Sequence, residues 1–361
     1  MTNLANSGRF VTVPVIALLR RMRHIRTNKT RHASDRSLGF ETAHPGGFLF
    51  LAIANLPINP GMKFAKPAVS IEGQIALLEA RGMTVPDHQH AKHCLQHMSY
   101  YRLRAYWLPF EDAAPAQGEH KFRAGTSFDD VLALYVFDRK LRLLVMDAVE
   151  RVEVSLRGSW AHHLAMKYGS HGYLDPTLYH RADRYAKAFT SLLDEIERSK
   201  DTFIKHYRDK YDDPEHPPIW MTAEVISLGQ LSKWLGNLKL RPDRQAIAKP
   251  YGLDERVLVS LAHHLTYVRN ICAHHGRLWN KQFTVTMMMP NSPASLKLAM
   301  NKASDRRLYN TLAVLGYLMN VVAPGSRWRH EVIDLADSCP LADHHAIGFP
   351  ANWKTLPAWR V

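Results

Sequence analysis

Three side chains that lie close together in the sequence have the chemistry to act on a phosphate group. Arg269, Asn270 and His274 fall within the run RNICAHH. A histidine ring titrates near neutral pH and can accept or donate a proton, and the arginine guanidinium presents a fixed fork of donors to phosphate oxygens. Asn270 could orient either group. This combination of residue types indicates proton transfer at a phosphate.

A helix over residues 255–279 would position these side chains. Its apolar residues, three and four positions apart, predict a seam that faces a helical core: Leu258, Leu261, Leu265, Val268 and Cys272. At about 100° per residue, the far side carries His263, Tyr267, Asn270, His274 and Arg277. A solvated face usually shows Glu and Lys, whereas imidazoles, a phenol and an amide handle protons and phosphates. His263, Tyr267 and Arg277 are therefore candidates for binding RNA beside the motif. His275 falls on the core side, and we expect it to be packed.

Arg269 and His274 do not share one helix face. Residues five apart are separated by about 140°, so Arg269 must curl round the helix or serve a second copy of the chain. A homodimer that brings two such helices together is therefore expected.

A second Arg and His pair at the same spacing is a rival to the motif. Chance alone gives about one or two such pairs in this sequence, and Arg157 with His162 is one of them. Arg157 also shares a helix face with Glu150 and Glu153, which is either a solvated, salt-bridged face or the wall of a cleft in which Arg157 is a candidate for binding RNA.

Rings and cations alternate in the stretch SYYRLRAYWLPF. Tyr101, Arg102 and Arg104 are candidates for binding RNA, because rings stack on bases and cations hold phosphates. The alternative, which the usual burial of aromatic residues favours, is that the rings pack the core of a small helical domain with the arginines at its rim.

The charge of the chain favours a polyanionic partner. Lys and Arg number 47 against 33 Asp and Glu, which gives a formal net charge of +14 at pH 7. Nucleic acid is the leading candidate, and surplus surface charge on an ordinary soluble protein is the alternative.

The cysteines and the hydropathy indicate a cytoplasmic protein without a membrane anchor. Cys94, Cys272 and Cys339 are odd in number and widely spaced, unlike a disulfide framework or a zinc ribbon. His162 and His163 lack partners at metal spacing, so we expect no metal and no cofactor. No apolar run approaches the roughly 20 residues of a membrane helix.

Four segments follow from the pattern along the chain. Residues 1–61 are basic and broken by Gly and Pro, as in a disordered arm, and Met62 is an alternative start. Residues 62–125 predict a small N-terminal helical domain, residues 126–323 a helical bundle, and residues 324–361 an irregular tail. Helices are expected after Ser70, through residues 94–98, from Ser127 to Gly169, over 183–199 and 221–239, after Asp254 and over 305–322. The fold class is all-α.

Five blocks of the sequence resemble the Abi-like abortive-infection proteins of the AbiD and AbiF type. They are KPAVSIEGQIALLEARGM, SYYRLRAYW, FDRKLRLLVMDAVERVEVSLR, PIWMTAEVISLGQLSKWLGNLK and VRNICAHHGRLWN, within residues 62–322. The last block is similar to the R-N-x-x-x-H signature of the HEPN ribonuclease superfamily. The resemblance implies a HEPN-like helical bundle whose two motif copies face each other and cleave RNA without a metal.

The resemblance also implies roles for the motif residues. Arg269 would neutralise charge on the scissile phosphate, His274 would act as general base or acid, and Asn270 would orient them; the 2′-hydroxyl would be the nucleophile. The implied protein is the toxin of a phage-defence system, with a regulatory RNA or an antitoxin as a further partner. Two alternatives stay open: a non-catalytic RNA-binding component of a defence or toxin-antitoxin system, and a helical protein-interaction module.

Overall fold

The computed structural model describes residues 67–112 and 120–360. Over these residues the fold is all-α, as predicted, with isolated bridges and no strand. Within them, no helix is both long enough and apolar enough to cross a lipid bilayer. The predicted arm over residues 1–61 and the alternative start at Met62 lie outside the described residues.

Three short helices come first. They are α2 (Ile71–Ala80), α3 (His88–Met98) and α4 (Tyr100–Trp107). The Ser70 hydroxyl accepts the backbone N–H of Gly73 at 3.1 Å, which confirms the predicted start of α2. Tyr106 and Trp107 are buried in the core, so for these two rings the packing interpretation is correct.

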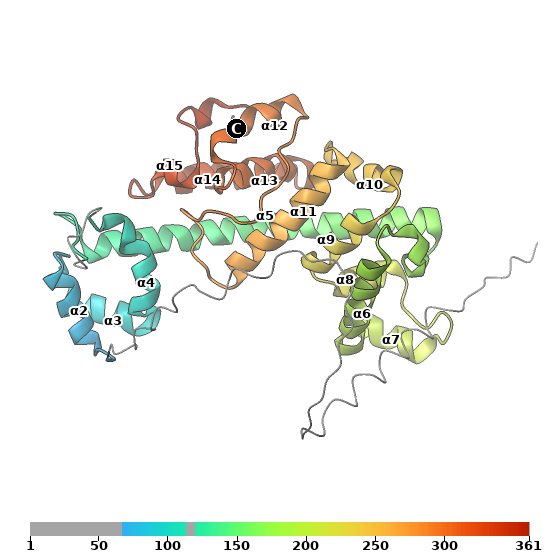
Figure 1. Cartoon of the computed structure of the whole chain (residues 1–361), viewed down its shortest axis with the longest axis horizontal. Coiled ribbons are helices and arrows are strands. Elements are labelled where there is room, and N and C mark those ends of the chain that lie inside the picture. The colour runs from blue at the N-terminus through green and yellow to red at the C-terminus, as the bar shows by residue number, and fades with distance from the viewer. Residues whose placement is uncertain (1–66, 113–119, 361) are drawn as a thin grey trace, which may run out of the picture. The chain divides into compact units, whose positions relative to one another are not determined.

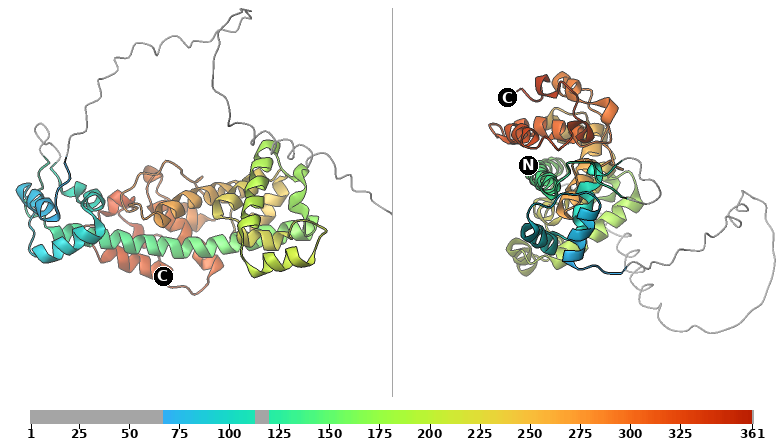
Figure 2. Two further views of the ribbon diagram at one scale, coloured as in Figure 1. Left: turned by 90° about the horizontal axis from the view of Figure 1, so that it is seen from below. Right: turned by 90° about the vertical axis from the view of Figure 1, so that its left-hand side faces the viewer.

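The longest helix is α5 (Phe128–Tyr168), with 41 residues. Ser127 and Asp130 form a reciprocal capping box at its start, and Gly169 ends it with φ +83°, both where the sequence predicts. Helices α4, α8, α10, α11, α13 and α14 all pack against α5. It runs through the middle of Figure 1, and one panel of Figure 2 looks along its axis.

Five helices follow, over residues 182–248. They are α6 (Ala182–Arg198), α7 (Thr202–Lys210), α8 (Ile219–Val225), α9 (Leu228–Asn237) and α10 (Arg241–Ala248). The single helix predicted over 221–239 is wrong, because Ile226 is extended and Ser227 forms a capping box with Gln230 that begins a new helix.

The helix that carries the motif is α11 (Glu255–Ala273), and Asp254 caps its start. Its predicted apolar seam is buried throughout. Helix α9 lies against it at two glycines seven residues apart: a Cβ on Gly229 would come within 3.2 Å of Thr266, and one on Gly236 within 3.4 Å of Val259. The small residues therefore allow the two backbones to approach closely.

The C-terminal residues are more regular than predicted. They form α12 (Ala294–Ala299), α13 (Tyr309–Val322), α14 (Trp328–Asp337) and α15 (His344–Ile347). Trp328, Trp353 and Trp359 are all buried, and the Trp328 indole donates to the Leu144 carbonyl of α5 at 2.8 Å. The prediction of an irregular tail over residues 324–361 is therefore wrong for the segments that form α14 and α15. Although the tail is rich in Pro and His, its tryptophans bury apolar surface against the rest of the fold. Figure 2 shows α13 and α14 along one side of α5.

Short 3-10 turns connect these helices: η1 (Leu108–Phe110), η3 (Gly172–Leu174), η4 (Pro176–Leu178), η5 (Lys249–Tyr251), η6 (Lys302–Ser304) and η7 (Trp353–Thr355).

Candidate functional site

Arg269, Asn270 and His274 lie together at the C-terminal end of α11. Arg269 and Asn270 belong to its last turn, and His274 is its C-cap residue. All three side chains are exposed, and none has a hydrogen bond or ion pair with any residue that the structure describes. The structure thus leaves a guanidinium, an amide and an imidazole free at one helix end.

The helix ends six residues earlier than the sequence predicts. The N–H of His275 donates to the Cys272 carbonyl at 3.0 Å, and the N–H of Gly276 donates to the Ile271 carbonyl at 2.8 Å. This pair of bonds is a Schellman motif, which requires a left-handed residue between helix and turn. That residue is His275, at φ +56°. Its predicted packing in the core is therefore wrong: its side chain is exposed.

A left-handed histidine is a strained choice at this position. Glycine usually occupies it, because a Cβ in this region clashes with the following carbonyl at a cost of about 1–2 kcal/mol. Contacts from elsewhere in the fold must supply that free energy. They act on residues 274–279, which we call the α11 turn.

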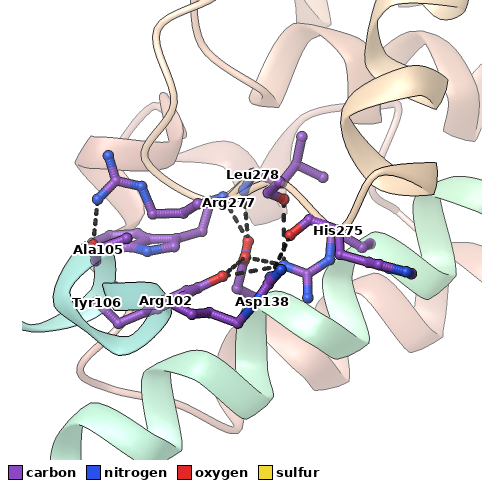
Figure 3. Close-up of polar contacts among 10 residues, drawn as sticks. Arg102, Ala105, Tyr106, Asp138, His275, Arg277 and Leu278 are labelled. Atoms are coloured by element: carbon purple, nitrogen blue, oxygen red, sulfur yellow. Dashed lines mark hydrogen bonds and ion pairs between the residues drawn. The ribbon is translucent and has the colours of Figure 1, made fainter. Parts of the chain in front are cut away.

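The first set of contacts comes from Asp138 of α5. Its carboxylate accepts the backbone N–H of Leu278 at 3.0 Å and that of Trp279 at 2.8 Å (Figure 3). The other carboxylate oxygen accepts the Tyr106 hydroxyl at 2.7 Å and pairs with Arg142. A buried carboxylate with four donors is fully satisfied, so it fixes the α11 turn against α5.

Burial governs the ionisation of this network. Asp138 is completely buried, and desolvation raises its pKa, while the hydrogen bond from Tyr106 and the charge of Arg142 act in the opposite direction. Desolvation together with the Asp138 charge raises the pKa of the Tyr106 hydroxyl, which therefore stays protonated as a donor.

The second set of contacts comes from α4. The Arg102 guanidinium donates to the His275 carbonyl at 2.8 Å, and the Arg277 guanidinium donates to the Ala105 carbonyl (Figure 3). Arg102 and Arg277 were both predicted to bind RNA. The structure instead engages each of them with a backbone carbonyl.

Two other residues of the predicted RNA-binding set lie on α4 without a side-chain partner among residues 67–112 and 120–360. Tyr101 is 83% exposed, and Arg104, three residues further along the same helix face, is also exposed. They differ in this respect from the buried Tyr106 and Trp107 of the same stretch. A ring and a cation one turn apart can stack on a base and contact a phosphate.

Helix α11 carries two histidines before the motif, one exposed and one buried. His263 is exposed, whereas the predicted candidate Tyr267 is half-buried with its ring edge-on to Phe283 at 5.9 Å between centroids. His264 is buried and lies 2.8 Å from both the Val285 carbonyl and the Thr311 hydroxyl. Because a carbonyl can only accept, Nδ1 of His264 donates and Nε2 accepts from Thr311. Burial lowers the pKa of His264 and keeps the ring neutral.

The rival pair is not assembled into a site. The Arg157 guanidinium pairs with Glu153 and donates to the carbonyls of Ala223 at 3.2 Å and Glu224 at 2.9 Å, near the end of α8. His162 is exposed on the same helix. Arg157, a predicted RNA-binding residue, therefore joins α5 to the end of α8.

The neighbouring His163 belongs to a different cluster. It lies 2.9 Å from Asp243 of α10, which also accepts Lys167 at 2.5 Å and Tyr168 at 2.7 Å. Burial acts to raise the pKa of Asp243, but the hydrogen bonds from Lys167, His163 and Tyr168 outweigh it and lower that pKa. The cluster fastens α10 to the end of α5.

A pocket of about 580 Å³ lies away from the motif, between α3, α5 and the segment after α14. His90, Cys94, Asp129, Lys140 and Cys339 contribute its polar groups and thiols. None of the three motif residues lines it. Across residues 67–112 and 120–360, no three His, Cys, Asp or Glu side chains gather as ligands for a metal ion.

The three motif residues thus lie at an exposed helix end and not in the pocket. The model of the Abi-like protein family matches residues 93–280, just over half of the chain, and this chain belongs to that family. The match runs from α3 through the α11 turn and includes the motif, Arg102 and Asp138. Neither a curated protein nor a solved structure matches the chain.

The sequence interpretation missed Asp138 and Arg142, and for Tyr106 it allowed for burial but not for the hydrogen bond to Asp138. A signal was present, because Asp138 and Arg142 interrupt the apolar stripe of α5 between Leu134 and Val145 at core positions. A buried carboxylate four residues from a buried arginine indicates a functional or structural network.

Proposed function

We propose that this protein is a metal-independent endoribonuclease of the HEPN type, acting in abortive-infection defence. Membership of the Abi-like family supports the defence role. One observation carries the catalytic role: Arg269, Asn270 and His274 lie exposed at one helix end, free of partners among the described residues. Exposed groups that no other side chain engages are available to a substrate.

The chemistry uses the ribose of the substrate as its own nucleophile. His274 removes the proton of the 2′-hydroxyl, the 2′-oxygen bonds to phosphorus, and the bond from phosphorus to the 5′-oxygen breaks. A second imidazole protonates the leaving 5′-oxygen. The products are a 2′,3′-cyclic phosphate and a 5′-hydroxyl. Arg269 stabilises the charge on the phosphate oxygens, and such proton transfer contributes about 10²- to 10⁴-fold.

A second copy of the chain supplies the second imidazole. The part of each chain that the structure describes carries one set of motif residues without side-chain partners, and Arg269 and His274 leave α11 in different directions. Two copies related by a twofold axis would place two sets around one phosphate. Because the motif is exposed and lies outside the pocket described above, both an RNA strand and the motif of a second copy can reach it.

The test compares expression of the wild type with that of His274→Ala, followed by sequencing of RNA 5′ ends. Wild type should halt growth and generate 5′-hydroxyl ends, and His274→Ala should abolish both. Purified protein should cleave equally with and without a chelator, and a DNA of the same sequence should resist because it lacks the 2′-hydroxyl. Equal cleavage by His274→Ala would refute the assignment.

A second candidate function is RNA binding without cleavage. The exposed Tyr101 and Arg104 on α4 favour it, because they form a stacking and phosphate-binding surface that does not depend on the motif. Under this function the purified protein would bind RNA with an affinity that falls steeply with salt, and no fragments would appear. Arg104→Ala would then reduce the salt slope by about one.

A further inference from the structure

Arg102 connects the only two strained backbone positions outside glycine in the described residues. Those positions are Ser99 at φ +61° and His275 at φ +56°. The backbone N–H of Arg102 donates to the Ser99 hydroxyl at 3.4 Å, and its guanidinium donates to the His275 carbonyl at 2.8 Å. One residue of α4 is therefore bonded to the ends of two helices.

The C-terminal end of α11 can most easily change conformation at His275. A histidine relaxes readily from the left-handed to the right-handed region, because its Cβ makes the left-handed region unfavourable. Glycine alone occupies the two regions at similar cost. Right-handed geometry at His275 would let α11 continue, as the sequence pattern predicts it should. The site would then lose the helix end on which His274 sits.

Cations from two helices oppose that continuation. Arg102 donates to the His275 carbonyl, and Arg142 of α5 lies 3.4 Å from the next carbonyl, that of Gly276. A guanidinium close to the C-terminal end of a helix also interacts favourably with the negative end of the helix dipole. The bond from Arg102 is the shorter, and it falls on the strained residue itself.

We infer that Arg102 is a positioning residue of the nuclease site, which holds His275 left-handed and thereby places His274, rather than a ligand of the RNA phosphate. The inference rests on the proposed function. It also separates Arg102 from Arg104, which is exposed on the same helix and has no partner among the described residues.

Glycine at position 275 provides the decisive test. If Arg102 acts only by holding His275 left-handed, a glycine there adopts that conformation without help, and the arginine becomes dispensable. The experiment therefore compares Arg102→Ala, His275→Gly and the double variant Arg102→Ala/His275→Gly in the full chain. Circular dichroism of each variant confirms folding before kinetics are measured.

Arg102→Ala should lower kcat about tenfold, with KM unchanged, because one charge-assisted hydrogen bond is lost. The double variant should recover kcat to within about twofold of His275→Gly. RNA binding, measured in a His274→Ala background, should keep its salt slope in Arg102→Ala and lose about one unit in Arg104→Ala. A double variant as slow as Arg102→Ala, or a raised KM with a shallower salt slope, would overturn the inference.

A structural readout separates this inference from the nuclease assignment. Amide exchange at Gly276 reports its bond to the Ile271 carbonyl. Exchange should accelerate in Arg102→Ala and return to the wild-type rate in the double variant, whether or not the protein cleaves RNA. Unchanged exchange in Arg102→Ala refutes the positioning role even in an active enzyme, and cleavage by His274→Ala refutes the nuclease alone.

Discussion

Asp138 accepts the backbone N–H of Trp279 at 2.8 Å, although 141 residues separate the two in the sequence. The bond joins the first half of α5 to the turn that ends the motif helix. It lies inside the protein, where salt screens it much less than a contact at the surface. The position of the exposed motif is thus set by a buried carboxylate that touches none of the three motif residues.

Removal of that carboxylate should be severely destabilising. Asp138→Ala leaves the Arg142 charge, the Tyr106 hydroxyl and two backbone N–H groups without their acceptor in the interior, a loss of about 3–5 kcal/mol. Urea unfolding of wild type and variant would measure it. Asp147→Ala is the matched control, because Asp147 and Arg151 form the same i,i+4 pair on α5 at the surface. That change should cost below about 1 kcal/mol, and similar losses in both would contradict the role of Asp138.

An inactive variant should suppress the wild type if one site needs an imidazole from each copy. His274→Ala is expected to be inactive, and a dimer of one wild-type and one His274→Ala chain keeps a single imidazole. After equal amounts are mixed and re-annealed, a quarter of all dimers are wild type, so activity should fall to about half of that of the unmixed wild type. The measurement is cleavage of a labelled oligoribonucleotide across mixing ratios. Unchanged activity despite proven subunit exchange would mean that one chain is sufficient for the site.

His275→Gly should stabilise the protein. The native residue is held at φ +56°, which glycine adopts freely, so the change should add about 1 kcal/mol after allowing for the entropy of glycine in the unfolded chain. Thermal unfolding should show a rise of a few degrees. His275→Ala is the control, because it removes the imidazole but keeps the Cβ that causes the strain. A stabilising His275→Ala would mean that the ring, not the backbone, is unfavourable.

Mild acid should weaken the fold through His264. Burial lowers its pKa in the folded state, so below the ordinary value of about 6.5 the unfolded chain binds a proton that the folded chain refuses. This contribution to stability is complete above that pH and declines as the pH falls, by at most about 1.4 kcal/mol per pH unit. Urea unfolding between pH 7.5 and 5.5 would show the slope. His264→Asn cannot titrate there and should flatten it; an equal slope would assign the effect to other groups.

Local patterns predicted those parts of the fold that local chemistry controls. The start and end of α5 at Ser127 and Gly169 follow from a capping box and a left-handed glycine. The buried seam of α11 follows from its spacing. The end of α11 could not be predicted in this way, because His275 takes a conformation that its own chemistry disfavours and that bonds from Arg102 support.

The same reasoning applies to the candidate site. Residue type and spacing were enough to select Arg269, Asn270 and His274, and their exposure is compatible with that choice. Arg102, Arg157 and Arg277 were selected for their charge, yet each donates to backbone carbonyls on another part of the fold. Charge predicts that an arginine seeks an acceptor. It does not say whether the acceptor is a phosphate or the chain itself.

The length of α5 has a consequence for how the protein is made. Its packing partners lie on both sides of it in the chain, from α4 to α14, so its apolar stripe stays incompletely covered until Asp337 has been synthesised. At about 5–20 residues per second, that interval after Tyr168 lasts roughly ten to thirty seconds. During it the nascent chain presents an incompletely covered helix surface to chaperones, although the residues of α4 and α5 that support the α11 turn have already been translated.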